Sequence, residues 1–384
     1  MKRLLLLLFV CVSCLDPYNP PASADSLNAL VVDGYVDING NASVTLMRSI
    51  PLNGYTPQPI EPGAVVEIET SEGERTQLHE DDKATYTASG LSVNYSSTYQ
   101  LNIETSNGRR YQSDPVRVYK TPEIDSIYFT ISRDFDEVEL RINAHDTNPE
   151  ALGYYVVDGI ETYEYHANAV SNFKLVNHKA VRRTPDEQVY FCWRDLTASP
   201  TVIDTHSLSD KVLNGLKVYT INHDDVKLKI RYSDLVTIRA IGEQEYTYMD
   251  QLIKSTQQQA SLYAVSPGPV LGNVHSIDDP HEYVLGYFTA RELKAQRVFI
   301  ERGDLPGGFT IVQPSSECMT QASCLAVEDG SSPTSCIAIN DLANVAITDV
   351  LFDSRGNDSQ YIYVNLECGD CRTLGGYTKK PSFW

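Results

Sequence analysis

The chain has few basic residues, few tryptophans and methionines, and only one short apolar run. Lys and Arg number 31 against 51 Asp and Glu, which gives a formal net charge of −20 at pH 7. Nucleic acids and anionic lipid headgroups both favour basic patches, so the charge argues against either as a partner. The apolar run at residues 4–10 is too short to span a bilayer, which takes about 20 residues.

Sequence motifs for catalysis are also missing. The eight histidines are scattered, with no pair at metal-ligand spacing, and there is no Gly-x-Ser-x-Gly elbow, glycine-rich phosphate loop or dinucleotide fingerprint. Three acidic stretches, at residues 79–82, 223–225 and 278–282, are interpreted as solvated turns, with calcium binding as the alternative. We therefore expect a protein that is not an enzyme, with no catalytic residue, no metal and no cofactor.

The N-terminal sequence predicts export and lipidation. Lys2 and Arg3 precede the apolar run, and the small residue Ser13 stands directly before Cys14, which is the arrangement of a bacterial lipoprotein signal. Residues 1–13 are thus a predicted signal peptide, and Cys14 a predicted lipid anchor to the membrane. An ordinary secretory signal is the alternative. Residues 14–28 are rich in proline and small polar residues and predict a flexible tether. Leu15 after the lipidated cysteine favours the outer membrane, with the protein facing the cell exterior.

Six further cysteines follow the anchor. An even number in an exported chain favours disulfides. The pair in Cys368-Gly-Asp-Cys371 follows a strand-like segment and precedes Gly375-Gly376, so we expect it to form two separate disulfides. A redox pair, or a zinc site completed by Cys318 and Cys324, are the alternatives. Fifteen pairings are possible, of which Cys318–Cys324 is the simplest local closure. The candidates are Cys192, Cys318, Cys324, Cys336, Cys368 and Cys371.

Hydrophobic alternation predicts an all-β fold with one or two helices. Residues 29–120 hold about seven short strands separated by turn signals such as Asn39-Gly40 and Asn107-Gly108, the pattern of an immunoglobulin-like sandwich. Residues 121–384 predict a larger β-rich domain with disulfide-stapled loops, including a long loop over residues 304–340. A helix is predicted at residues 243–258, with an apolar stripe facing the core.

Several segments together resemble one family. They are LVVDGYVD, SNGRRYQSDPV, PEIDSIYF, FCWR at 191–194, GPVLGNV from Gly268, LGYF at 285–288, and the end of the chain with CGDC, Gly375-Gly376 and KPSFW. Together they are similar to the Bacteroidota lipoproteins grouped as domain of unknown function 4249. The resemblance implies a β-rich outer-membrane lipoprotein, often associated with a SusC-like TonB-dependent transporter, and carries no catalytic residues. It implies that CGDC is a covalent staple and that the terminal aromatics pack on the second domain.

The sequence and the resemblance lead to one functional expectation and two alternatives. We expect a surface-exposed, lipid-anchored accessory subunit of an outer-membrane β-barrel, with a SusC-like nutrient importer as the first candidate. The first alternative is an accessory subunit of an outer-membrane protein assembly or secretion machine. The second is a glycan-binding lipoprotein, since the 24 tyrosines could stack on sugars.

Overall fold

The fold is taken from a computed structural model. It describes residues 28–50, 59–81, 83–145, 152–176, 179–206, 212–258, 269–307, 309, 318–323, 344–352, 354 and 358–384. The chain divides into two compact units. The first consists of residues 1–93, 97–116 and 267–289, and the second of residues 94–96, 117–266 and 290–384. None of the described helices is long and apolar enough to cross a membrane.

The first unit is a β-sandwich of two five-stranded sheets. One sheet has the order β19-β1-β2-β6-β5 and the other the order β18-β8-β7-β3-β4. The strands are β1 (Leu30–Asp37), β2 (Ala42–Arg48), β3 (Val65–Thr70), β4 (Arg75–Gln77), β5 (His79–Glu80), β6 (Thr85–Ala88), β7 (Tyr99–Glu104), β8 (Arg110–Ser113), β18 (Val274–Ser276) and β19 (Val284–Arg291).

Alternation along the strands builds the interior of this sandwich. In β2 every second residue from Ala42 is buried, and the others are half-buried, as a strand with one face on a core requires. Tyr86, Tyr99 and Tyr111 are fully buried between the sheets. The predicted all-β fold with an N-terminal immunoglobulin-like sandwich is confirmed.

The predicted domain boundary differs from the structure in one respect. Residues 267–289 belong to the first unit, whereas the sequence pattern assigned them to the C-terminal domain. β18 pairs with β8, and β19 is the neighbour of β1, so this segment adds one edge strand to each sheet. Pairing between residues more than 150 positions apart leaves no local pattern, which is why alternation alone did not reveal it.

Residues 267–289, which we call the returning segment, belong to the first unit. Two glycines allow this segment to pass close to its own backbone and to that of β1. A β-carbon on Gly272 would lie 1.5 Å from the carbonyl oxygen of Gly286, and one on Gly286 would lie 1.8 Å from that of Val32. Gly286 also has φ +94°, a conformation that favours glycine. These glycines belong to the GPVLGNV and LGYF segments, so the two motifs have a structural role.

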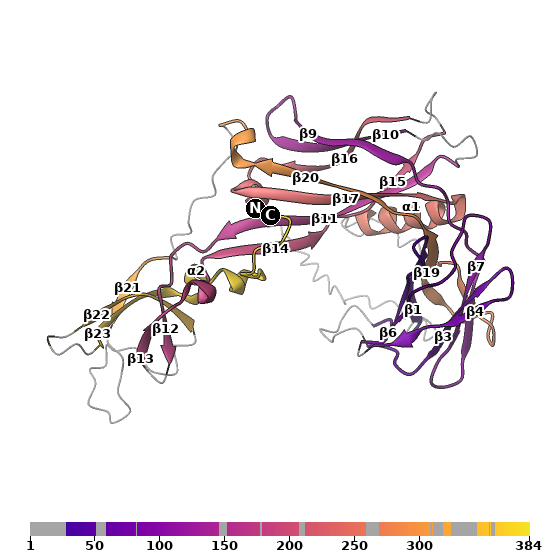
Figure 1. Ribbon diagram of the computed structural model, residues 1–384, viewed down its shortest axis with the longest axis horizontal. Coiled ribbons are helices and arrows are strands. Elements are labelled where there is room, and N and C mark those ends of the chain that lie inside the picture. Colours follow the sequence, from indigo (N-terminus) through magenta and orange to yellow (C-terminus); the bar gives the residue numbers. More distant parts are fainter. Residues whose placement is uncertain are drawn as a thin grey trace, which may run out of the picture. The chain divides into compact units, whose positions relative to one another are not determined.

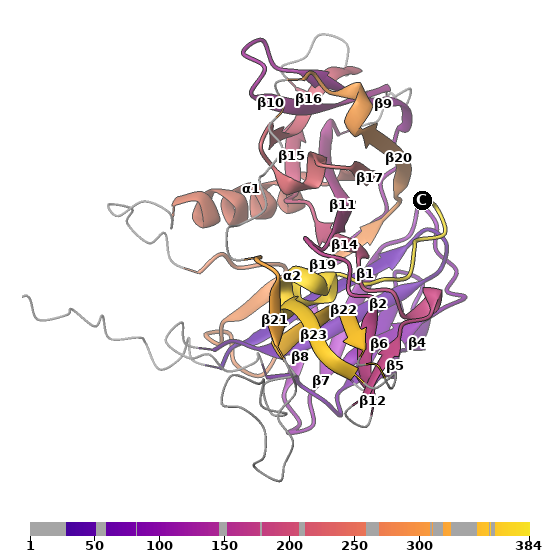
Figure 2. The ribbon, with the colours of Figure 1, turned by 90° about the vertical axis from the view of Figure 1, so that its left-hand side faces the viewer.

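The second unit contains another sandwich (Figures 1 and 2). A sheet of order β16-β10-β9 faces a sheet of order β14-β11-β17-β20, with β15 also paired to β11. Two apolar clusters, one around Val236 and the other around Ile300, fill the interior. The strands are β9 (Glu123–Ile131), β10 (Glu137–His145), β11 (Tyr154–His166), β14 (Phe191–Thr197), β15 (Thr201–Asp204), β16 (Val212–Asn222), β17 (Arg231–Ile241) and β20 (Lys294–Glu301).

A smaller third sheet, of order β13-β12-β22-β23-β21, completes the second unit. It is composed of β12 (Phe173–Val176), β13 (Lys179–Arg182), β21 (Gln321–Ser323), β22 (Val345–Phe352) and β23 (Asp358–Asn365). Ile347, Val350 and Tyr361 form its buried cluster. β21 lies in the segment predicted as a long loop, and most of that segment is outside the described residues.

The helix α1 (Glu243–Gln258) has the predicted bounds, but its apolar stripe does not enter the core. Leu252 is 39% exposed, and Tyr246, Met249 and Ile253 are only half-buried. Tyr246 stacks on Tyr154 at 4.7 Å between ring centroids. Among the helix residues whose burial is described, Glu245 is the buried one, and it pairs with Arg239.

Candidate functional site: a disulfide-bound clasp and an acidic core

Two disulfides fix the C-terminal part of the second unit. Cys192 on β14 is bonded to Cys371, and Cys318 is bonded to Cys368. The prediction that Cys368 and Cys371 belong to separate disulfides is thus confirmed. The suggested Cys318–Cys324 closure is wrong, because Cys318 pairs with Cys368 instead. Cys14, Cys324 and Cys336 lie outside the described residues.

Short helical turns surround CGDC. A one-turn helix, α2 (Leu366–Gly369), holds Cys368, and a 3-10 turn, η6 (Cys371–Leu374), follows. Asp370 accepts a hydrogen bond from the backbone N–H of Arg372 and begins that turn. The short turns aim the two sulfurs at different partners, so the pair acts as two staples.

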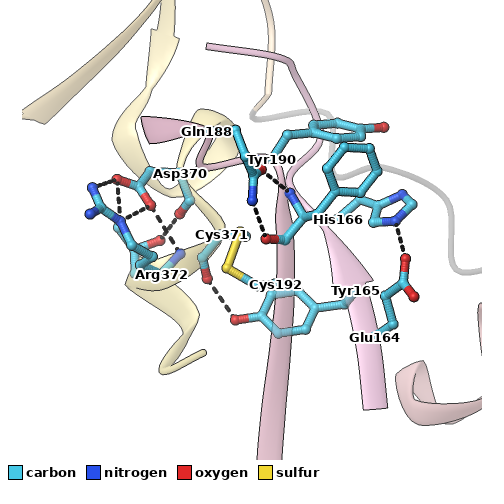
Figure 3. The surroundings of a disulfide bond; sticks show 11 residues. Glu164, Tyr165, His166, Gln188, Tyr190, Cys192, Asp370, Cys371 and Arg372 are labelled. Atoms are coloured by element: carbon cyan, nitrogen blue, oxygen red, sulfur yellow. Dashed lines mark hydrogen bonds and ion pairs between the residues drawn. A yellow bond between two sulfur atoms is a disulfide. The ribbon is translucent and has the colours of Figure 1, made fainter. Parts of the chain in front are cut away.

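Residues 371–384 form a segment that we call the clasp, and its first contacts surround the Cys192–Cys371 bond (Figure 3). The Tyr165 hydroxyl donates to the Cys371 carbonyl at 2.6 Å. Burial is the largest effect that raises the pKa of Tyr165, so this hydroxyl stays protonated and remains a donor. The clasp therefore begins at a buried covalent bond supported by a buried hydrogen bond.

The Gly375-Gly376 pair lets the clasp turn and then lie against β14. Gly375 has φ +83° and ends the 3-10 turn. A β-carbon on Gly376 would lie 2.2 Å from the Tyr165 hydroxyl and 2.9 Å from the Trp193 carbonyl. Directly afterwards, Tyr377 and Trp193 exchange backbone hydrogen bonds of 2.9 Å in both directions. Each glycine is thus needed for its own reason: one for backbone conformation, the other for close approach.

The end of the clasp packs on the face of the sheet that is turned away from the core. The indole N–H of Trp384 donates to Glu164 Oε2 at 3.0 Å. The Arg231 guanidinium lies 5.0 Å from the Trp384 ring centroid, and that of Arg297 lies 3.5 Å from the Phe383 ring. Such cation–π contacts are worth about 0.5–2 kcal/mol each. The expected packing of the terminal Phe-Trp on the second domain is therefore present.

Two titratable groups of this region are perturbed by their surroundings. Burial, followed by the hydrogen bond to Asp195, raises the pKa of Tyr377 to about 12. Burial acts to raise the pKa of Asp370, but the hydrogen bonds and charge of Arg372 outweigh it, so that this pKa is lowered. Both effects favour the protonation states that the contacts need, a protonated phenol and an ionised carboxylate.

A second polar group lies inside the sandwich of the second unit. Glu161 on β11 stands directly opposite Asp234 on β17, both toward the core. Glu161 accepts hydrogen bonds from Lys227 at 2.9 Å and Tyr232 at 2.7 Å, while Asp234 accepts one from Tyr219. These five residues form what we call the acidic core. Two carboxyl groups directly opposite each other repel when both are ionised.

This arrangement raises the pKa of Asp234 well above its ordinary value. Burial, with the charge of Glu161, raises the pKa of Asp234 to about 6 against a hydrogen bond from Tyr219 that lowers it. A carboxyl group with such a pKa could serve as a general acid or base. However, Asp234 and Tyr232 have no exposed surface, so substrate would have to open the sandwich to reach them. We interpret the acidic core as a structural element that responds to pH.

We expect Asp234→Asn to stabilise the protein at pH 7.5 by about 2–3 kcal/mol. Because the folded-state pKa of about 6 lies above the ordinary value of 3.8, the folded chain binds the proton more tightly than the unfolded chain. The stability that this group contributes is therefore complete below pH 3.8 and is lost as the pH rises to about 6, at about 1.4 kcal/mol per unit. The variant has no such loss. Denaturant unfolding at pH 7.5 and pH 4 measures the difference.

The matched control is Asp186→Asn, since Asp186 is an exposed carboxylate on the 3-10 turn η2 (Pro185–Glu187). It should follow the wild type at both pH values. The Asp234→Asn variant should lose its advantage at pH 4, where wild-type Asp234 is itself neutral. A constant difference between Asp234→Asn and the wild type at both pH values would contradict the assignment.

In the structure, residues of the acidic stretches noted in the sequence make ion pairs and hydrogen bonds with other parts of the chain. Asp278 pairs with Arg110 at 2.7 Å, and Glu282 pairs with Arg109 at 3.0 Å, which ties the returning segment of the first unit to β8. Asp225 caps the 3-10 turn η3 (Val226–Leu228). Glu80 accepts from the backbone of Gly63. Within the described part of the chain, no group of three or more His, Cys, Asp or Glu could hold a metal ion.

The sequence did not identify the acidic core. Glu161, Asp234 and Tyr219 stand on three different strands, and none of them belongs to a motif. A usable signal was the placement of Glu161 and Asp234 at core positions of otherwise apolar strands, where an acidic residue interrupts the alternation. For the clasp, Gly375-Gly376 and the terminal Phe383-Trp384 were part of the family resemblance, which implied a structural role.

Comparison with solved structures gives weak likenesses to β-sandwich proteins. A two-domain fibronectin type III segment of chicken tenascin aligns with 56% of this chain and 93% of its own, at 10% identity and a TM-score of 0.16. The Yersinia pseudotuberculosis adhesin InvE aligns with 56% of this chain and 57% of its own, at 13% identity and a TM-score of 0.15. The E. coli alpha-2-macroglobulin aligns with 58% of this chain and 14% of its own, at 9% identity and a TM-score of 0.19. With TM-scores this low, the sandwich assignment rests on the sheets described above.

Comparison of the sequence gives a clear result. A search of curated proteins finds no match to the chain. The model of the family described as "Domain of unknown function (DUF4249)" matches residues 15–297. The match includes the LVVDGYVD, GPVLGNV and LGYF segments but ends before CGDC and the clasp. Since it covers most of the chain, the chain belongs to the DUF4249 family.

Proposed function

We propose that this protein is a surface-exposed lipoprotein, anchored to the outer membrane through Cys14, that acts as a non-enzymatic accessory subunit of an outer-membrane β-barrel complex. A SusC-like TonB-dependent nutrient importer is the first candidate for the barrel. Anchoring confines the two sandwiches to the membrane surface and so raises their effective concentration near the barrel. The protein would then act by contact with the barrel's exposed loops.

Export is supported by the disulfides together with the N-terminal sequence. Cys192, Cys368 and Cys371 are all buried, and Cys371 has no exposed surface. Both bonds form within the second unit. Structural disulfides of this kind are typical of chains that fold outside the reducing cytosol. A basic, apolar, Ser-Cys start is the matching signal for export with lipidation.

The observation that carries the partner proposal is the exposed apolar surface of the third sheet. Phe352 is 57% exposed and Leu351 46%, while Val176 and Val181 are each exposed by more than 40%. All four are strand residues, on β22, β12 and β13. Exposed large apolar side chains on the strands of one small sheet favour a protein–protein contact on that sheet.

Affinity purification tests the proposal. The tagged protein is recovered from outer membranes in mild detergent, and every co-purifying chain is identified. We expect one TonB-dependent barrel in near-equal amount. The variant Leu351→Asp/Phe352→Asp should lose this barrel, whereas Phe135→Asp should retain it. Phe135 is the matched control because it is 63% exposed at the turn between β9 and β10.

Each other outcome points to a different conclusion. Recovery of an assembly or secretion barrel would move the protein to the alternative function in protein biogenesis. Recovery without any barrel would overturn the accessory role. Retention of the barrel by both variants would place the contact away from the third sheet. Protease treatment of intact cells tests orientation, and a protein cleaved only after the outer membrane is opened would not face the exterior.

A further inference from the structure

The first unit contains a groove on the outer face of the sheet that includes β1, β2, β6 and β5. Its cavity volume is about 640 Å³. Neighbouring residues on these strands, such as Val36, Val44 and Tyr86, are fully buried, so their alternating partners face away from the core. The described residues that line the groove are Tyr35, Asn41, Ala42, Ser43, Thr76, Gln77, His79, Thr87, Ala88 and Ser89.

Strand register sets four of these side chains in one row. Tyr35 stands opposite Ser43, Ser43 opposite Thr87, and Thr87 opposite His79. With strands about 4.8 Å apart, the row spans roughly 14 Å. Gln77, at the point where the chain leaves β4 for β5, stands next to the end of the row. The groove thus has the length of a short oligomer and an aromatic ring at one end.

Four polar side chains at the groove are available for a ligand. Within the described residues, the side chains of Ser43, Thr87, Gln77 and His79 have no hydrogen-bond partner in the protein. Hydroxyl and amide groups both donate and accept, so together they match a ligand that carries many hydroxyl groups. The Tyr35 ring adds a flat apolar surface with a polar tip.

Charge narrows the class of ligand further. The described lining residues include no Asp, Glu, Lys or Arg, although these residues make up 21% of the chain. Recognition of a carboxylate or phosphate would call for Arg or Lys, and a metal ion would call for carboxylates. A net charge of −20 also disfavours the approach of an anion.

From this geometry we propose that the groove binds a neutral glycan of two or more sugars, with Tyr35 stacking on a sugar ring and Ser43, Thr87, Gln77 and His79 hydrogen-bonding its hydroxyl groups. This site is independent of the barrel partner, because it is formed entirely by described residues of the first unit. It gives the protein a direct ligand and places recognition on the N-terminal sandwich.

Calorimetric titration of the full chain tests the site. The protein is held in a detergent without a sugar headgroup, such as dodecyldimethylamine oxide, because a glycosidic detergent would compete. The probes are the hexaoses of the maltose, cellobiose, xylan and mannan series, with hexagalacturonate as a charged comparison. We expect at least one neutral hexaose to bind with a Kd of about 1 mM or better and to bind more tightly than hexagalacturonate.

Variants assign the binding to the groove. Tyr35→Ala should weaken it by about tenfold or more, as loss of stacking worth roughly 1.4 kcal/mol requires, and Thr87→Ala several-fold. The matched control is Tyr283→Ala, since Tyr283 is a 38% exposed tyrosine of the same unit outside the described groove lining. It should bind like the wild type.

The proposal has clear ways to fail. It is overturned if none of the neutral hexaoses binds at about 10 mM, or if hexagalacturonate binds most tightly. It is also overturned if Tyr35→Ala and Tyr283→Ala bind the same hexaose equally well. Thr87→Ala guards against a folding defect, because this exposed hydroxyl can be removed without opening the core.

Discussion

Replacing Cys192 and Cys371 together with alanine is expected to lower the free energy of unfolding of the second unit by at least about 5 kcal/mol. The two residues are 179 positions apart. In the chain-entropy model, closing a loop of this length lowers the conformational entropy of the unfolded state by an amount worth about 5 kcal/mol. Both residues are changed at once so that no unpaired thiol is left to exchange with other cysteines.

The loss should be larger than the entropy alone, because the bond also holds the clasp in place. Without it, Tyr165 loses a fixed acceptor, and the clasp is held only by non-covalent contacts, such as the paired hydrogen bonds between Trp193 and Tyr377. Guanidinium unfolding followed by tryptophan fluorescence measures the effect. The chain has two tryptophans, Trp193 and Trp384, and both lie at the clasp, so the signal reports on this unit.

The matched control is the Cys318→Ala/Cys368→Ala variant. Its bond closes a separation of 50 residues, for which the same model gives about 4 kcal/mol, and it is not attached to the clasp. We expect Trp384 fluorescence in native buffer to shift toward the solvent-exposed value in the first variant and to stay unchanged in the control. Equal stability of the Cys192/Cys371 variant and the wild type would contradict the structural role of the bond.

Local pattern was enough to predict much of this fold. Alternation around Val32 and Val44, the Asn-Gly turns and the periodicity of residues 243–258 each depend on neighbours in the sequence. The strand before CGDC and the division between the two cysteines followed from similarly local arguments. Such features could be predicted because a strand or helix shows its exposed and buried faces in its own residues.

Features that join distant residues could not be predicted in the same way. Cys318 is six residues from Cys324 but bonds Cys368, because folding brings it close to the one-turn helix α2. β18 and β19 join sheets whose other strands end by residue 113. The groove depends on register between β1, β2, β6 and β5, and a shift of one residue would turn Ser43 and Thr87 into the core. Long-range pairing, and not propensity, decides all three.

Asn273→Ala is expected to destabilise the first unit by about 4 kcal/mol. Asn273 is 2% exposed, and its side-chain amide donates to the Phe288 carbonyl and accepts from the Phe288 N–H, both at 2.9 Å. Alanine would leave these two buried backbone groups without partners, each at a cost of about 1–3 kcal/mol. The measurement is hydrogen exchange of the backbone amides of β18 and β19.

The position of Asn273 explains why the loss should spread to both sheets. Its own carbonyl accepts from the Asp114 N–H at 2.7 Å, just after β8, while its side chain bonds Phe288 on β19. One residue therefore links β19 of one sheet to the end of β8 in the other, and the variant should lose protection in β18 and β19 together. The matched control is Asn39→Ala, an exposed asparagine of the same unit, expected to change stability by less than about 0.5 kcal/mol. Unchanged protection of β19 in the Asn273 variant would contradict this role of Asn273. The returning segment would then be held instead by its ion pairs to Arg109 and Arg110.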